Sequence, residues 1–322
     1  EYVMGEKFTL TGALNDVREA TTTSGVKTKK EATLLAGKLN YKYDDDLSLW
    51  GIVQTTLREK NYTYSQIYTV GASKDFFKDK LKLKAEYSIA DNKDDNLTAR
   101  IELRPFGSYS VYTGYSLVND SEGKSDKVVF GQNYQVTKDF GIYSEHQLLK
   151  DPDARSTIEA YGISYKVKDN YTLGIAYQQG VVNENAGESY KRRAVSLSSS
   201  YDKSKFKLTN KFEYRIDNKS SLNEETYVTT NGFSVRLTDS LRGLANFDYS
   251  ISRDRETDET IERYSEANVG FAFRPVTNNR LAILGRYRNI QQEDNTSRTN
   301  VTDQKKEIFE AEVNYKLSNK WS

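Results

Sequence analysis

Few side chains in this sequence could carry out acid–base or nucleophilic chemistry. Histidine occurs once, as His146, and cysteine does not occur at all. A hydrolase needs a positioned acid–base group, most often a histidine, and thiol catalysis or a thiolate metal site needs cysteine. We therefore predict that the protein is not an enzyme, and that His146 packs against its neighbours or faces an aqueous interior.

One acidic run, Asp44-Asp45-Asp46, could bind a divalent cation, because hard cations prefer carboxylate oxygens. A solvated turn is the simpler interpretation of the same run. The sequence contains no EF-hand spacing, no phosphate-binding glycine loop and no nucleophile elbow. We therefore expect neither a metal nor a cofactor.

The residues left to consider are charges that alternate with apolar side chains. The stretch FKLTNKFEYRID, residues 206–217, places Phe206, Leu208 and Phe212 on one face of an extended chain and Lys207, Lys211 on the other. A period of two indicates a β-strand with one apolar and one charged face. In a soluble sandwich the apolar face would be buried, whereas in an outer-membrane barrel it would contact lipid.

Composition narrows the choice. Charged residues make up 29% of the 322 residues and hydrophobic residues 36%, and no run of roughly 18 apolar residues exists, which excludes transmembrane helices. A transmembrane barrel remains compatible, because its apolar residues occupy only alternate positions. The 24 Tyr and 13 Phe favour strands, and only 3 Pro interrupt them. The net charge of +1 gives no basic field for nucleic acid.

Two kinds of connection alternate along the chain. Compact ones such as YDDDL near position 45 recur roughly every 30 to 40 residues, with longer polar runs such as VVNENAGESYKRR between them. This predicts an all-β fold, a transmembrane antiparallel up-and-down β-barrel of about 18 or more strands with short periplasmic turns and longer extracellular loops. The N-terminus would be periplasmic, and residues 1–322 would form a single barrel domain.

A soluble β-protein is the competing interpretation, since antiparallel sandwiches also alternate. About eighteen strands in simple meander order are unusual for a sandwich, in which Greek-key connections are common. A soluble closed barrel would also need apolar residues inside, whereas almost every strand here keeps one polar and one apolar face. The pattern therefore favours the membrane barrel.

If the charged face of each strand lines the lumen and the apolar face contacts lipid, the alternation predicts two sets of residues. We call these two sets of alternate positions the polar phase and the apolar phase. The predicted pore-lining residues are Lys82, Lys84, Glu86, Arg100, Glu102, Arg104, Lys207, Lys211, Glu213, Arg215, Arg286, Arg288, Glu310, Glu312 and Lys316. The predicted lipid-facing residues are Leu81, Leu83, Tyr87, Leu173, Ile175, Tyr177, Phe206, Leu208, Phe212, Tyr214, Phe271, Phe273, Phe309, Val313 and Tyr315. Trp50 and Ile52 fall on the otherwise polar phase.

The stretch ANVGFAFRPVTNNRLAILGRYRNI, residues 267–290, resembles hairpins in the barrels of porin-like and large surface proteins of Gram-negative outer membranes. This resemblance implies a location in the outer membrane and the lipid bilayer as a partner. Such barrels typically end in a strand with a terminal aromatic residue, whereas this sequence ends in YKLSNKWS. Either the barrel continues beyond Ser322, or the last residues are a tail.

Two functions fit these observations. The first is a wide polar-lined pore through which hydrophilic solutes or a larger cargo pass, because barrels of this strand number leave a lumen. The second is a structural anchor or sheath whose lumen is occupied by a plug or partner protein within a larger surface assembly. Lumenal charges of mixed sign argue against strong ion selectivity in the first case.

Overall fold

The computed structural model describes residues 7–23, 26–61, 65–120, 123–185, 187–219, 222–276, 280–295 and 302–316. Within these residues the chain forms eighteen β-strands. No helix in the described part is long and apolar enough to cross a bilayer.

The strand bounds follow the alternation seen in the sequence. The first nine strands are β1 (Phe8–Thr23), β2 (Val26–Lys42), β3 (Leu47–Lys60), β4 (Ile67–Phe76), β5 (Leu81–Ala90), β6 (Asp95–Phe106), β7 (Tyr109–Asp120), β8 (Gly123–Gln135) and β9 (Phe140–Lys150). The second nine are β10 (Ala154–Lys168), β11 (Tyr171–Glu184), β12 (Ser189–Lys203), β13 (Phe206–Asn218), β14 (Asn223–Arg236), β15 (Leu241–Asp254), β16 (Thr260–Phe273), β17 (Leu281–Asp294) and β18 (Thr302–Lys316).

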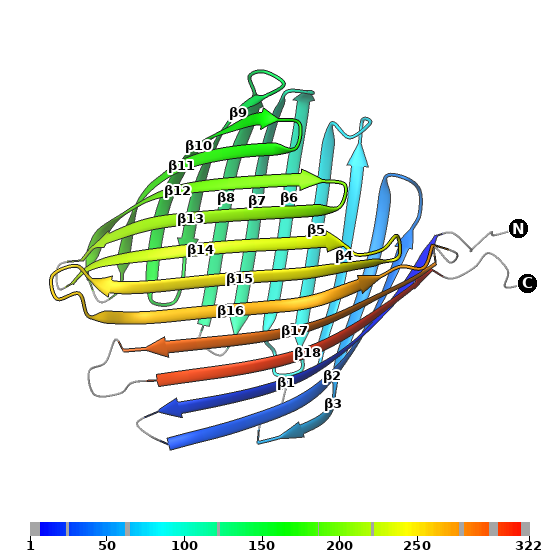
Figure 1. Ribbon diagram of the computed structural model, residues 1–322, viewed down its shortest axis with the longest axis horizontal. Coiled ribbons are helices and arrows are strands. Elements are labelled where there is room, and N and C mark those ends of the chain that lie inside the picture. Colours follow the sequence, from blue (N-terminus) through cyan, green and yellow to red (C-terminus); the bar gives the residue numbers. More distant parts are fainter. Residues whose placement is uncertain are drawn as a thin grey trace, which may run out of the picture.

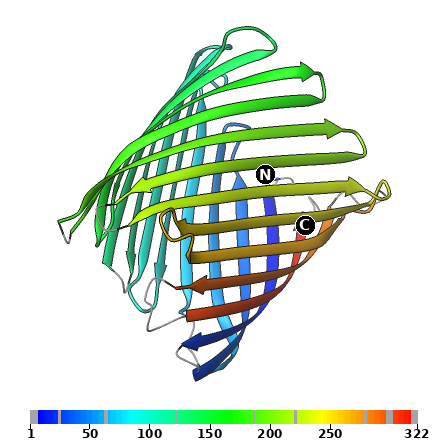
Figure 2. The ribbon, with the colours of Figure 1, turned by 60° about the vertical axis from the view of Figure 1, so that its left-hand side comes forward.

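The strands form one antiparallel sheet in which each pairs with its neighbours in sequence, and β1 also pairs with β18. This closing ladder runs from Thr9 opposite Lys316 to Thr23 opposite Thr302, so neither edge is left open. Figure 1 shows the blue β1 beside the red β18, and strands of opposite walls cross in both views because they are tilted to the barrel axis (Figure 1, Figure 2). The predicted closed all-β barrel of about eighteen strands is confirmed.

The cross-strand registers align the two phases of each strand into rows around the barrel. Ile163, Ile175 and Leu197 are successive members of one row, and these side chains are 44%, 50% and 52% exposed. Glu213, on the other phase, is 7% exposed. Side chains converge inside a closed barrel and spread apart outside it, so the apolar phase is the outer one.

Aromatic side chains border the apolar outer belt on both sides. We call the end with the compact connections the turn end and the opposite end the loop end. A turn-end girdle consists of Phe8, Tyr41, Phe76, Phe106, Tyr109, Tyr134, Phe140, Tyr165, Tyr171, Tyr201, Phe206, Phe273 and Tyr315. A second band toward the loop end includes Tyr68, Tyr115, Tyr161, Tyr177, Tyr214 and Tyr287, whose hydroxyl groups donate to Gln66, Asp126, Glu159, Gln179, Glu225 and Glu307 respectively. Rings in lipid with their hydroxyl groups directed to polar partners are typical of a membrane interface.

Beyond the second band the strands continue with polar residues on both faces, and we call this part of the wall the collar. The polar run VVNENAGESYKRR, for example, lies mostly in β11 and β12, and only residues 185–188 connect these strands. The expectation of longer loops at one end is therefore corrected. The ladder hydrogen bonds need no alternation of side-chain polarity outside lipid, so polar residues extend the strands instead of forming loops.

Candidate functional site: the inner wall

The predicted pore-lining residues share the inner phase of the barrel. The registers place Lys82, Lys84, Glu86, Arg100, Glu102 and Arg104 on β5 and β6, Lys207, Lys211, Glu213 and Arg215 on β13, and Arg286, Arg288, Glu310 and Glu312 on β17 and β18. The backbone of Lys316 continues the same phase of β18, and its side chain lies outside the described part of the chain. The predicted lipid-facing residues share the outer phase, with side chains such as Phe212 and Phe309 exposed by 46% and 44%.

Ion pairs line the wall formed by β12 and β13. The Glu213 carboxylate accepts bonds from Lys211 Nζ at 2.8 Å and from Arg215 Nη2 at 2.7 Å, and its side chain is only 9% exposed. Arg192 binds Asp217 in a bidentate manner, with Nε–Oδ1 and Nη2–Oδ2 distances of 2.8 and 2.7 Å. This planar geometry is the strong form of an arginine–carboxylate pair. Arg192 and Asp217 were not among the predicted residues, because only the register brings them together.

Further pairs join the strands that close the barrel. Arg286 on β17 binds Glu310 on β18, and Arg288 Nε lies 3.2 Å from Glu266 Oε1 on β16. These contacts cross from strand to strand, so they fix the side chains against the wall.

An aromatic residue bridges three strands, β3 to β5, on the inner face of the barrel. The indole of Trp50 covers Gly71 so closely that a Cβ atom there would lie 2.2 Å from the ring. Its Nε1 atom donates to Glu86 Oε2 at 2.8 Å, and the ammonium groups of Lys38 and Lys84 lie 5.6 and 5.5 Å from the ring centroid. The position of Trp50 on the polar phase is thus explained by a glycine on β4 and a glutamate on β5.

Tyr112 repeats this arrangement four strands further along the sheet. Its ring covers Gly131 on β8, its hydroxyl group donates to Glu145 on β9, and the Arg100 guanidinium lies 4.2 Å from the ring centroid. We call both arrangements aromatic–glycine–glutamate bridges. Sequence alone did not identify these bridges, because their three members lie on three consecutive strands and only the register aligns them.

Two arginines at the turn end of the lumen are direct cross-strand neighbours. Arg236 on β14 lies opposite Arg242 on β15, and in the described residues neither is within ion-pair distance of a carboxylate. Both line a cavity of about 510 Å³ that also reaches Glu312 and Asn314 on β18. Like charges placed opposite each other are destabilising unless solvent or an anion screens them, so this pair adds local positive charge to a cavity that Asp239 and Glu312 also line.

His146 lies on the outer phase, so it does not face the interior; it packs edge-to-face against the ring of Tyr161, with the ring centroids 6.4 Å apart, which is the other alternative that the sequence left open. Its register partners are Phe130 and Glu159, and its Nδ1 atom is 3.7 Å from Glu159 Oε1. Ser144 and His146 interrupt the apolar phase of β9 beside Tyr161 of the second aromatic band, where the Tyr161 hydroxyl group donates to Glu159, so the imidazole stands among polar partners. His146 therefore does not contribute to the inner wall.

The acidic run Asp44–Asp46 forms a turn. Asp44 Oδ1 accepts the backbone N–H groups of Asp46 and Leu47 at 2.9 and 2.6 Å, and Asp45 pairs with Lys42 at 2.7 Å. Desolvation opposes ionisation of Asp44, yet these N–H donors and Lys74 hold the pKa of its carboxyl group below 3.8. The carboxylates of Asp44 and Asp45 are therefore engaged in shaping the turn.

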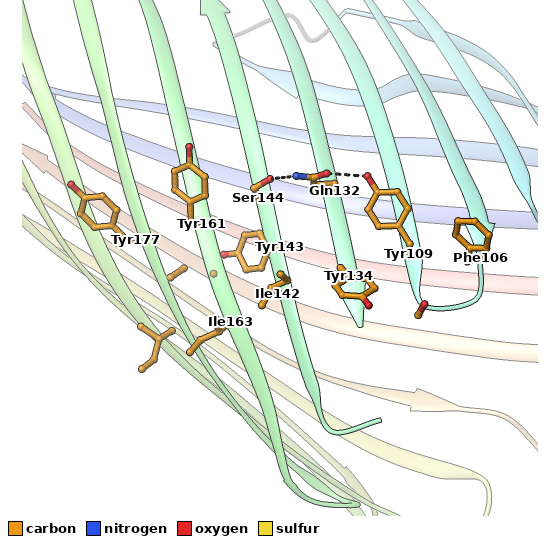
Figure 3. A pocket seen from close by; sticks show the side chains of 14 residues that line it. Phe106, Tyr109, Gln132, Tyr134, Ile142, Tyr143, Ser144, Tyr161, Ile163 and Tyr177 are labelled. Atoms are coloured by element: carbon orange, nitrogen blue, oxygen red, sulfur yellow. Dashed lines mark hydrogen bonds between the residues drawn. The ribbon is translucent and has the colours of Figure 1, made fainter. Parts of the chain in front are cut away.

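A concavity of about 1040 Å³ lies over β6 to β11. Most of its lining, including Tyr134, Ile163 and Tyr177, belongs to the outer phase, so we do not assign it to the lumen. Figure 3 shows a row across this surface in which Tyr109 donates to Gln132 and Gln132 donates to Ser144, both at 3.0 Å. The row adjoins the turn-end girdle, where water and lipid head groups can reach it.

Comparison with known proteins supports the fold. No family model matches the chain, and no curated protein matches it. Among solved structures, Pseudomonas aeruginosa OccK9 (OpdG) is 10% identical with a TM-score of 0.59, covering 97% of this chain and 99% of that one. Pseudomonas aeruginosa OpdK, solved with vanillate, is 11% identical with a TM-score of 0.56, covering 95% and 99%. A bacterial polysaccharide outer-membrane secretin is 9% identical with a TM-score of 0.51, covering 97% and 99%. The chain thus has the fold of an outer-membrane β-barrel, as the sequence predicts.

Proposed function

We propose that this barrel is a wide, polar-lined pore of the outer membrane through which hydrophilic solutes pass. The observation that carries the proposal is the combination of a closed sheet of eighteen strands with an inner phase of paired charges. Barrels of 16 to 18 strands leave an aqueous channel when nothing folds into them. Between the described strands, the longest connections are residues 274–280 and 295–301, which are too short to fill such a lumen.

Mixed charges on the inner wall favour passage of many polar solutes over strict ion selectivity. Glu213 and Glu310 pair with neighbouring cations, whereas Arg236 and Arg242 at the turn-end mouth have no carboxylate within ion-pair distance among the described residues. One solved neighbour was determined with vanillate, and another is described as a bacterial polysaccharide outer-membrane secretin. We propose no single solute for this chain.

The two ends of the barrel suggest its orientation. At the turn end the strands stop at the aromatic girdle, whereas at the loop end they continue into the collar. We propose that the turn end, where β1 starts and β18 ends, is periplasmic, and that the collar projects from the outer surface of the cell. The whole chain would then act as a single barrel domain without enzymatic activity.

Single-channel conductance in planar bilayers tests the pore. We expect a stable ohmic conductance of porin size or larger, reduced by neutral polymers that are small enough to enter. Protein that inserts, as shown by protease protection of the strands, but stays electrically silent would refute the pore. That result would leave the second function, a sheath whose lumen a plug protein fills.

A further inference from the structure

A hydrogen-bonded row of polar side chains crosses the middle of the lipid-facing belt. On β13 Asn210 lies between Phe206 of the turn-end girdle and Tyr214 of the second band, so it occupies the centre of the apolar stretch. Its register partner on β14 is Asn231, and Asn210 Nδ2 donates to Asn231 Oδ1 at 2.7 Å. Both side chains are half-buried on the outer phase.

The row does not satisfy all its hydrogen-bonding groups internally. Asn231 Nδ2 donates to Thr229 Oγ1 at 3.1 Å and to the Phe247 carbonyl at 3.3 Å, and Ser199 Oγ is 3.5 Å from Asn210 Oδ1. An amide has two N–H donors and an oxygen with two acceptor positions. In the described residues the second N–H of Asn210 has no partner, which is costly in hydrocarbon.

The depth of the row identifies what can cover it. Lipid tails offer neither donors nor acceptors at mid-belt, whereas lipid esters and water lie near the aromatic borders. The Tyr109–Gln132–Ser144 row (Figure 3) runs between two such borders, because Tyr109 belongs to the turn-end girdle and Ser144 pairs with Tyr161 of the second band. The Asn210–Asn231 row has no such explanation.

We propose that the outer face of β12, β13 and β14 around Asn210 and Asn231 is the interface with a second copy of this chain. An amide row is self-complementary: under a two-fold axis the donors of one copy meet the acceptors of the other, which is the isologous contact that homodimers use. Polar side chains between apolar ones act as such contacts within membranes. Leu197, Phe212 and Phe233 flank the row and are 52%, 46% and 43% exposed, so they supply the surrounding apolar contact.

This interface goes beyond the proposed pore, since either barrel could conduct alone. The absence of cysteine permits a direct test in reconstituted lipid vesicles. Single cysteines at Leu208→Cys and Phe212→Cys, which flank Asn210, should form disulfide-linked dimers on mild oxidation, whereas Leu83→Cys on the outer face of β5 should not. Equal cross-linking at all three positions, or none at Leu208→Cys and Phe212→Cys, would overturn the proposal.

The amides themselves are tested by the double variant Asn210→Leu with Asn231→Leu, compared with Gln132→Leu from the border row. We expect the double variant to raise the monomer–dimer dissociation constant in vesicles by roughly tenfold, and Gln132→Leu to leave it unchanged. Heat-dependent gel mobility verifies that each variant is folded. A wild-type protein that is monomeric in vesicles, or a double variant that dimerises as well as wild type, would show that the row contacts lipid or another protein. Conductance is measured separately, so a failed interface and a failed pore are distinguishable.

Discussion

Adding one methyl group at Gly71 should dislodge Trp50 from the inner wall. A Cβ atom there would lie 2.2 Å from Cε2 and 2.5 Å from Nε1 of the indole, far inside contact distance. The ring would have to swing away from β4, and its 2.8 Å hydrogen bond to Glu86 would break. The bridge across β3, β4 and β5 would then be lost.

The expected cost follows from the contacts that the ring makes. A hydrogen bond to a charged acceptor contributes about 1.5 to 3 kcal/mol to stability, and each exposed cation–π contact adds about 0.5 to 1 kcal/mol. Some of this is recovered when the ring finds a new position in the lumen. We therefore expect Gly71→Ala to lower the free energy of unfolding by about 2 to 4 kcal/mol.

The measurement is urea unfolding of protein folded into lipid vesicles, followed by tryptophan emission. Trp321 is the only other tryptophan, so the Trp321→Phe background makes emission report on Trp50 alone. Gly51→Ala is the matched control, because the nearest atom to a Cβ there is 3.9 Å away. If Gly71→Ala matches Gly51→Ala in stability and keeps the wild-type emission, the bridge does not support the wall and the reasoning is wrong.

Three other expectations concern charges. Replacing Glu213 by Gln leaves its two cationic neighbours unpaired on a crowded wall and should lower the free energy of unfolding by roughly 3 kcal/mol. Lys207→Gln, at an exposed ion pair, should change the free energy of unfolding by less than about 1 kcal/mol. Equal effects of the two variants in urea unfolding would contradict this expectation. The Asp44 carboxyl has a pKa lowered below its usual 3.8, so its contribution to stability is present above that pH and is lost as the pH falls through the folded value. The difference in thermal midpoint between wild type and Asp44→Asn should accordingly vanish at low pH, and a constant difference would refute it. Converting both Arg236 and Arg242 to Glu should shift the reversal potential in a KCl gradient toward cation selectivity, and an unchanged potential would mean that the turn-end mouth does not contribute to selectivity.

Alternation alone predicted the barrel because lipid imposes it. In a segment such as 206–217, five of the six outward residues are apolar or aromatic and Asn210 is the exception, so the period of two is readable. The same constraint placed Phe212 and Lys211 on opposite phases. Where lipid ends, the constraint ends as well, and the polar runs on β11 and β12 were therefore mistaken for loops.

The sequence could not predict which side chains pair with each other across the strands. The neighbours of Arg192, Glu145 and Glu266 are one or two strands away, and a shift of one residue in register would exchange them all. Trp50 was noticed as an exception to the polar phase, but its reason, a glycine on the next strand, depends on that register. For His146 the sequence left packing and an interior position open, because Ser144 and His146 interrupt the apolar phase of β9 and blur its alternation.

The collar sets a boundary for how this protein can change in length. Within the belt, one inserted residue would turn every following side chain of that strand to the opposite face, placing lysines against lipid and phenylalanines in the lumen. In the collar both faces meet water, so the same insertion exchanges one polar side chain for another and leaves the belt below in register. Insertions and deletions should thus accumulate in the collar. A peptide tag inserted there should be displayed while the membrane-embedded part keeps its strand pairing.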